Sequence, residues 1–478
     1  MNVDTMKLSR KIKEIFSCDD LLEKKFEAGG CRFCLMYIDA MTDKAELEES
    51  VVEKLIKADS FGKPYEKSLN DILAYSEKPA AKQTPEEAAQ AIAEGDIALL
   101  IEGADAIYIV SLRKFATRAV TEPPTSSILK GPREGFIEDI KTNVTLLRRR
   151  LRTPDLKIKQ LKIGRYSNTY VYVAYLESVA DENVVSKVTE RLKKVDIDGV
   201  ADSSYLVNYL EERKFSLFDQ IGSTEKPDIL AAKMLEGRVG IIVDGSPIAL
   251  TVPFVLFEHF QDSYDYFASN MRATFLRFIR LFGAFFTIML PAVYVAMQEF
   301  HYHLLPLRFL VSIRNAIEGI PFTPPMEMLV VLLLFEVLHQ ASIRMPKYLG
   351  TALSIVGAIV LGETAVSAGL ISSPSVLIIA LSAIGVNCVP DDIGAMSTMR
   401  AAYLLVASVL GLYGMIIGAI TLIVYLATNT SYGAPYLAPF APIVEKDLKD
   451  TFFKANLVDM KERPYSFPNN NRHRSGGK

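Results

Sequence analysis

The stretch TPEEAAQAIAEGDIALLIEGADAIYIV, residues 84–110, decides the fold of the polar part of this chain. Thr84 is a typical N-cap, Pro85 suits the first helical position, and Glu87 stands three residues after the cap, as in a capping box. Gly95 ends the helix, and two apolar segments follow, separated by the turn sequence EGAD. The stretch therefore predicts a helix followed by two strands that a tight turn joins.

The same pattern occurs a second time, in EKPDILAAKMLEGRVGIIVDGSPIALTV at residues 225–252. Upstream of these stretches, residues 37–55 resemble residues 175–192. Two dipeptides match at one spacing of 142 residues, namely Glu94-Gly95 with Glu236-Gly237 and Glu102-Gly103 with Asp244-Gly245. A strand, helices, a further helix and two strands are thus expected twice, which indicates two related α/β subdomains in tandem.

Charge divides the chain into a polar part and an apolar part. Only 12 of the 109 Lys, Arg, Asp and Glu residues lie in residues 281–430. A membrane span needs about 20 apolar residues, and five apolar segments are found near 275–298, 325–342, 349–370, 374–390 and 401–427. The fold class expected is therefore α+β with a membrane part: two duplicated α/β subdomains, then a polytopic α-helical membrane domain of four to five segments.

The expected boundaries follow from these patterns. They are 1–130 for the first α/β subdomain, 131–160 for a connecting helix and basic linker, 161–268 for the second subdomain, 269–430 for the membrane domain and 431–478 for a polar tail. Arg272, Arg277 and Arg280 lie just before or at the start of the first apolar segment, which favours a cytosolic N-terminal region. The tail is basic too, which favours the same side, whereas five full spans would place it on the other. One short segment is therefore expected not to cross.

The linker helix ends in an arginine cluster at residues 148–152. Such a cluster could bind anionic lipid or nucleic acid, but it is more typical of a solvated face or of internal salt bridges. The rest of the chain shows no basic and aromatic pattern suited to reading nucleic acid, so no nucleic-acid partner is expected.

The segment VLLLFEVLHQ, residues 331–340, places Glu336 and His339 on one face of an apolar helix. The spacing also occurs in di-iron helix bundles, but those need a second Glu-x-x-His motif, which the sequence lacks. No phosphate loop, GxGxxG, GxSxG or HExxH motif is present either. We therefore expect no enzyme activity, no cofactor and no metal site.

Sparse polar groups in the apolar part are the residues most suited to meet ions, because a charged group in hydrocarbon is costly and usually functional. They are Glu336, Glu363, Asn387, Asp391 and Asp392. The alternative for each is a hydrogen bond between helices or an exposed loop position, and the two aspartates, which follow Pro390, could cap the next helix. Glu336 and His339 could bond each other, a neighbouring helix, or water in an ion path.

Small residues form two stripes that would let membrane helices pack closely, either within one subunit or between subunits. The first consists of Ser354, Ala358, Gly362, Ala365 and Gly369, and the second of Ala407, Gly411, Gly414 and Gly418. Between the first two apolar segments, residues 304–318 are amphipathic, which predicts an interfacial helix or a wall of an aqueous path.

Four stretches together resemble the A subunit of GerA-type bacterial spore germinant receptors, and they occur in the right order over nearly the whole chain. They are GPREGFIEDIKTNVTLLRRRL (131–151), DGSPIALTVPFVLFEHFQDSYDYF (244–267), MPKYLGTALSIVGAIVLGETAVSAGLIS (345–372) and YGAPYLAPFAP (432–442). The stage V sporulation paralogue of that subunit shares the layout and is the alternative within the same family.

The resemblance implies a location and partners as well as a fold. It implies the inner membrane of a bacterial spore, a cytosolic N-terminal region, a transporter-like B subunit and a lipoprotein C subunit. It also implies a homo-oligomer that forms an ion channel and releases monovalent cations during germination. The alternatives from other functional classes are a secondary transporter of amino acids or ions, and a membrane-anchored scaffold for the receptor complex.

Overall fold

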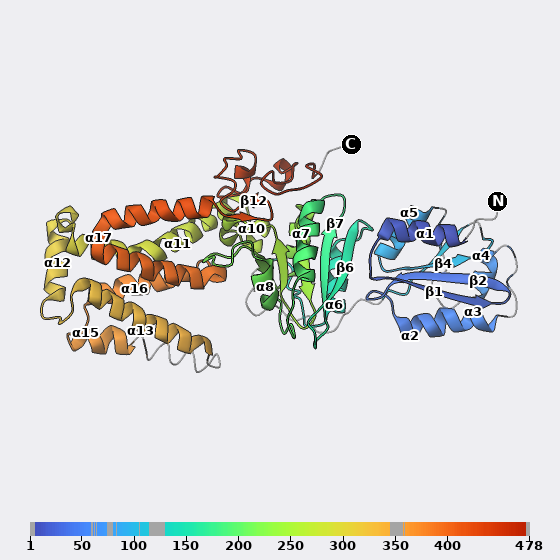
Figure 1. Cartoon of the computed structure of the whole chain (residues 1–478), viewed down its shortest axis with the longest axis horizontal. Coiled ribbons are helices and arrows are strands. Elements are labelled where there is room, and N and C mark those ends of the chain that lie inside the picture. The colour runs from blue at the N-terminus through green and yellow to red at the C-terminus, as the bar shows by residue number, and fades with distance from the viewer. Residues whose placement is uncertain are drawn as a thin grey trace.

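The computed structural model shows an elongated molecule with the N-terminal sheet at one end, a second sheet in the middle and a helical bundle at the other end (Figure 1). The structure describes residues 5–58, 61, 63, 65–73, 80–82, 84–104, 106–113, 130–344, 357 and 359–474, without the side chains of residues 5, 6, 343, 360, 361, 391 and 457.

The first subdomain contains a five-stranded antiparallel sheet in the order β1-β2-β4-β5-β3, with helices on its faces. Its elements are α1 (Thr5–Phe16), β1 (Leu21–Ala28), β2 (Cys31–Ile38), α2 (Lys44–Leu47), η1 (Glu48–Val52), α3 (Glu53–Lys57), α4 (Tyr65–Ile72), β3 (Ala80–Lys82), α5 (Pro85–Ala93), β4 (Ile97–Ile101) and β5 (Ile107–Val110).

The second subdomain repeats this order as β6-β7-β9-β10-β8, again antiparallel, which confirms the predicted duplication. A short 3-10 helix, η2 (Leu256–Phe260), follows the sheet. The other elements are α6 (Ile140–Arg150), β6 (Leu156–Ile163), β7 (Thr169–Leu176), α7 (Glu182–Lys193), α8 (Ser204–Leu210), β8 (Gly222–Thr224), α9 (Pro227–Leu235), β9 (Val239–Val243) and β10 (Ala249–Val252).

Local sequence signals explain why both units fold alike. The Thr84 side chain accepts a hydrogen bond from the backbone N–H of Glu87, 3.2 Å away, and Pro85 opens α5. Gly95 and its counterpart Gly237 both have φ of +100° directly after their helices, a conformation that favours glycine. The chain then turns into β4 in the first unit and into β9 in the second, and all ten residues of these two strands are buried.

The arginine cluster of the linker forms internal salt bridges, one of the two alternatives that the sequence left open. Arg148 is fully buried and donates to both carboxylate oxygens of Asp20 at 2.7 and 2.8 Å, which ties α6 to the first subdomain. Arg149 and Arg150 both bind Glu134. The Arg148–Asp20 pair therefore joins the linker to the first subdomain, and the Glu134 pairs lie within the linker.

The helical part begins with α10, and its described residues contain three helices long and apolar enough to cross a membrane, namely α11, α13 without its last two residues, and α17. Its elements are α10 (Ser263–Phe267), α11 (Asn270–Glu299), η3 (Tyr302–Leu304), α12 (Leu307–Ile317), α13 (Pro324–Arg344), η4 (Val360–Thr364), α15 (Ala365–Ser367), α16 (Ser373–Val386), η5 (Pro390–Asp392) and α17 (Ile393–Ala427). Residues 349–356 and 358 of the third predicted segment lie outside the described residues.

Helix α17 reverses direction in its middle, which differs from the single apolar segment expected from the sequence. Gly411 has φ of 58° and ψ of −146°, values that are not helical. Gly418 consequently faces the ring of Tyr403, and Met399 packs in the same cluster as Leu422. The two halves of α17 therefore lie side by side, and the second half runs back toward the sheets (Figure 1).

The tail continues from this returning half and packs against the second subdomain. It contains β11 (Thr430–Ser431), β12 (Ala434–Pro435), η6 (Asp447–Lys449) and η7 (Leu457–Asp459). The Ser431 hydroxyl donates to the carbonyl of Gln220 and accepts from the N–H of Phe254, and the N–H of Asn470 donates to the carbonyl of Val179. The tail and the second sheet therefore lie at the same end of the helical bundle.

A buried ionic cluster joins the start of α11 to the tail. Arg277 is fully buried and donates to Asp265, at 3.1 Å, and to Asp450, at 3.0 Å. Arg280 donates to both carboxylate oxygens of Asp265 at 2.8 and 3.0 Å. Burial raises the pKa of the Asp450 carboxyl, and Arg277 opposes that effect. Two of the arginines at the start of the first apolar segment are thus occupied by carboxylates of the protein itself.

Candidate functional site

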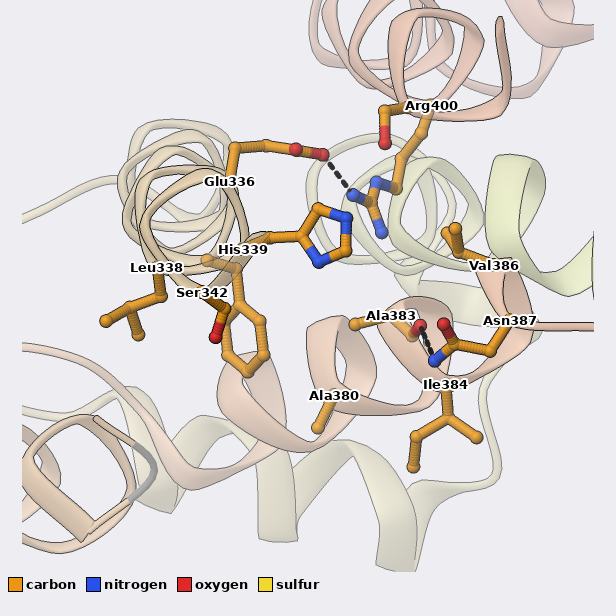
Figure 2. A pocket seen from close by; sticks show the side chains of 12 residues that line it. Glu336, Leu338, His339, Ser342, Ala380, Ala383, Ile384, Val386, Asn387 and Arg400 are labelled. Atoms are coloured by element: carbon orange, nitrogen blue, oxygen red, sulfur yellow. Dashed lines mark hydrogen bonds and ion pairs between the residues drawn. The ribbon is translucent and has the colours of Figure 1, made fainter. Parts of the chain in front are cut away.

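A pocket of about 290 Å³ opens between α13, α16 and α17, inside the helical part (Figure 2). Its walls are mostly apolar, and polar side chains line part of it. The lining residues are Phe335, Glu336, Leu338, His339, Ser342, Ala380, Ala383, Ile384, Val386, Asn387, Ser397 and Arg400. The pocket therefore brings together two of the residues predicted to meet ions, Glu336 and Asn387.

An ion pair between Glu336 and Arg400 stands at the pocket wall. Arg400 Nη2 donates to Glu336 Oε1 at 2.5 Å, which links α13 to α17. The Arg400 guanidinium is shielded from solvent, because its side chain is 4% exposed. The Glu336 side chain is 29% exposed and faces the pocket. Of the alternatives for Glu336, the structure shows the bond to a neighbouring helix.

Arg400 also connects this pair to the interior of the bundle. Its Nη1 donates to the hydroxyl of Ser382, 3.0 Å away, and that hydroxyl donates to the carbonyl of Thr287 at 2.8 Å. The Thr287 hydroxyl in turn bonds the carbonyls of Gly283 and Ser382. A chain of polar contacts thus joins α13, α17, α16 and α11, and it satisfies polar groups that would otherwise be stranded among apolar side chains.

His339 points from α13 into the pocket, one helical turn from Glu336 (Figure 2). Its Nε2 atom is buried and makes no hydrogen bond. Within the described residues no group of three or more His, Cys, Asp or Glu side chains is placed to hold a metal ion. Glu336 and His339 therefore line the same pocket, as their helical spacing predicted, and the Glu336 carboxylate is paired with Arg400.

Of the other predicted ion-pathway residues whose side chains the structure describes, Asn387 lines this pocket, and Glu363 and Asp392 do not. The Asn387 amide lies at the end of α16 and donates to the carbonyl of Ala383 at 3.5 Å, at the pocket wall. Glu363 is exposed on η4. Asp392 is 7% exposed at the start of α17, and the side chain of Asp391 lies outside what the structure describes. Glu363 and Asp392 therefore do not line the Glu336 pocket.

The packing residues predicted from the two small stripes have mixed positions. Ser354 and Ala358 lie outside the described residues. Gly362 has no atom within 4 Å of where a Cβ would stand. Gly411 lies at the reversal of α17, against the ring of Phe300. Gly414 and Gly418 follow on the returning half, so the second stripe does not form one continuous helix face.

Sequence reasoning missed the partners of Glu336. Arg400 is the one basic residue between residues 374 and 427, which is a signal that an acid in another helix must compensate its charge. Ser382 gave no signal, because serine is ordinary in packed membrane helices. Glu327, which is fully buried near the start of α13, looked like a common acidic residue in a first helical turn.

Comparisons with known proteins agree over nearly the whole chain. The family described as Bacillus/Clostridium GerA spore germination protein matches residues 7–466. Spore germination protein KA of Bacillus subtilis is 33% identical over 471 residues, which are 97% of this chain and 86% of that protein. Spore germination protein B1 of the same organism is 33% identical over 469 residues, 97% of this chain and 96% of that protein.

One solved structure is also similar: the N-terminal domain of the A subunit of the Bacillus megaterium spore germinant receptor GerK3. It is 26% identical, covers 53% of this chain and 96% of its own, and has a TM-score of 0.42. The three apolar helices described above make this chain a membrane protein. The chain belongs to the GerA family of spore germination proteins, as an A subunit of a germinant receptor.

Proposed function

We propose that this A subunit forms an oligomeric ion channel, which releases monovalent cations when the receptor senses a germinant. The observation that carries the proposal is the Glu336–Arg400 pair at the wall of a pocket in the apolar helical bundle. Charged groups inside a membrane are expensive and usually belong to a pathway or a gate. Simple helix packing would not need them.

The geometry gives this pair a specific role in the proposed channel. Arg400 occupies the Glu336 carboxylate, so a cation entering the pocket would have to compete with the guanidinium for it. We infer that the described arrangement is closed to cations and that opening separates the pair. Asn387 adds an amide at the same pocket. Glu363, Asp391 and Asp392 are kept as proposed pathway residues that another part of the assembly would bring to the ion path.

We further propose that the protein works in the inner membrane of the spore with its sheets on the cytosolic side. A transporter-like B subunit and a lipoprotein C subunit would be its partners, and further copies of this chain would complete the channel. The basic tail supports a cytosolic location, because it lies with the second sheet at one end of the bundle. The reversal of α17 at Gly411 supports it too, since it returns the chain to that end.

Flux through liposomes tests the channel. The purified chain, alone and with its partner subunits, should pass K⁺ or Na⁺ across liposomes, and Glu336→Gln should change the flux without loss of the assembled complex. Glu318→Gln, which removes an exposed carboxylate at the end of α12, is the matched control and should leave the flux unchanged. Absence of K⁺ and Na⁺ flux through the wild-type protein, both alone and with its partner subunits, would overturn the proposal.

Two other outcomes would identify the alternatives. Saturable uptake of a small substrate by this chain alone would identify a secondary transporter. Normal germination after residues 325–427 are replaced by an unrelated membrane anchor would identify a scaffold, because the polar pocket would then be dispensable.

A further inference from the structure

A second polar site lies at the other end of α16, where α11 and α13 meet its N-terminus. Glu327, one turn into α13, is fully buried. Its Oε1 atom accepts hydrogen bonds from the backbone N–H of Ser372 at 2.6 Å and from the Ser372 hydroxyl at 2.7 Å. Its Oε2 atom is buried and has no hydrogen-bond partner. One oxygen of this carboxylate therefore accepts two hydrogen bonds, and the other accepts none.

Side chains of α11 face the same spot with unsatisfied oxygens of their own. The Tyr294 hydroxyl and both amide atoms of Gln298 are buried without hydrogen-bond partners. These residues are four apart and share one helix face. The Tyr294 hydroxyl lies beside Ser375, Gln298 and Ser372, and Ser372 is the residue that donates to the Glu327 carboxylate. Oxygen atoms from three helices thus converge on one buried position.

The charge of Glu327 requires compensation at this position. Within the described residues no Lys, Arg or His forms a salt bridge with it, and the Arg400 guanidinium is bound to Glu336, about 14 Å further along α13 by the rise of the helix. The N-terminus of α16 meets part of this requirement, because the Ser372 N–H and hydroxyl both donate to Oε1 and leave Oε2 without a donor. A buried carboxylate without a positive partner is strongly unfavourable, so a positive charge is expected beside Oε2.

We propose that Glu327, Tyr294, Gln298 and Ser375 bind a monovalent alkali cation, K⁺ or Na⁺. Carboxylate, amide, hydroxyl and phenol oxygens are hard ligands that suit such ions. A single carboxylate balances one positive charge, whereas a divalent ion would leave the buried site with excess charge. The cation would hold α11, α13 and α16 together at the α12 end of the bundle, away from the sheets (Figure 1).

Thermal unfolding of the full chain in detergent tests this site. At constant pH and ionic strength, KCl or NaCl should raise the unfolding midpoint over that in choline chloride, by several degrees and in a saturable way, because a ligand that binds only the folded state stabilises it. Glu327→Gln keeps the shape and the acceptor for Ser372 but loses the charge, so the alkali response should disappear. Tyr294→Phe should raise the half-saturating concentration several-fold.

Glu299→Gln is the matched control, since it makes the same change at an exposed position near the end of α11 and should keep the full alkali response. Equal midpoints of the wild-type protein in all three salts would overturn the proposal, as would an alkali response that persists in Glu327→Gln. An unfolding midpoint that rises on acidification but does not change with alkali ions would overturn it too, because a proton would then neutralise Glu327 instead. The wild-type and Tyr294→Phe measurements stand if Glu327→Gln fails to fold. Binding of an alkali cation to the Glu327 site does not require that the protein conduct ions. The cation-site proposal and the channel proposal can therefore fail independently.

Discussion

Replacing Glu336 by glutamine should destabilise the bundle more than removing its partner Arg400. The neutral amide would leave the Arg400 guanidinium, 4% exposed, without a counter-charge and with the Ser382 hydroxyl still bound to it. Breaking a buried ion pair from one side typically costs about 3–5 kcal/mol. Because the Glu336 side chain is 29% exposed and part of the attraction is screened by water, we expect about 2–4 kcal/mol here.

The opposite change, Arg400→Met, should be milder. Methionine fills much of the same volume, and the abandoned Glu336 carboxylate can turn into the pocket, where it is already part exposed. We expect a loss of about 1–1.5 kcal/mol. The double variant Glu336→Gln/Arg400→Met should then be about as stable as Arg400→Met alone, because no buried charge is left unpaired.

Unfolding of the four proteins by a denaturing detergent, in micelles of fixed composition, gives the three free-energy differences and hence the coupling energy of the pair. The reasoning is refuted if Glu336→Gln costs no more than Arg400→Met. It is also refuted if the two changes add within about 0.5 kcal/mol, because additivity is the behaviour of residues that do not interact.

Three further outcomes are expected. Gly411→Ala should lose about 1–3 kcal/mol in thermal unfolding, because alanine rarely adopts the backbone conformation of the α17 reversal, whereas Gly394→Ala, in open space, should change little. Asp20→Asn should lose about 3 kcal/mol, since it leaves Arg148 buried and without its counter-charge; hydrogen exchange should then speed up in the first subdomain. Burial lowers the pKa of His259 to about 4, below its unfolded value of about 6.5. As the pH falls, the unfolded chain therefore binds the proton first, and the free energy of unfolding should fall by roughly 3 kcal/mol between pH 6.5 and pH 4. His259→Gln should flatten that slope, and an unchanged slope would contradict the assignment.

The fold of the soluble part could be predicted because its signals are local. The cap at Thr84, the glycines that follow α5 and α9, and the alternation of strands and turns act over a few residues each. Repetition of these signals at one spacing predicted two related sheets, and both sheets have the same strand order. The apolar composition predicted membrane helices for the same reason, since burial in lipid depends on short windows of sequence.

The candidate site could be predicted in part. A carboxylate among Val, Leu and Phe marked Glu336 as a candidate site residue, because such a group must be compensated. The sequence did not identify the compensating group, because Arg400 is 64 residues away and the pairing depends on how α13 and α17 pack. The possible bond between Glu336 and His339 was suggested by helical spacing, but the arginine, which carries a full charge, holds the carboxylate instead.

The sequence by itself determined which segments are polar, which are apolar and where helices and strands begin, because these properties depend on neighbours along the chain. The tertiary structure decided the direction of those segments and the contents of the two buried polar sites. The reversal at Gly411 illustrates the difference: a glycine in an apolar run is compatible with a straight packed helix or with a turn, and only packing against Phe300 and α11 selects the turn. Likewise, the oxygens around Glu327 come from three helices, and only their packing brings them together.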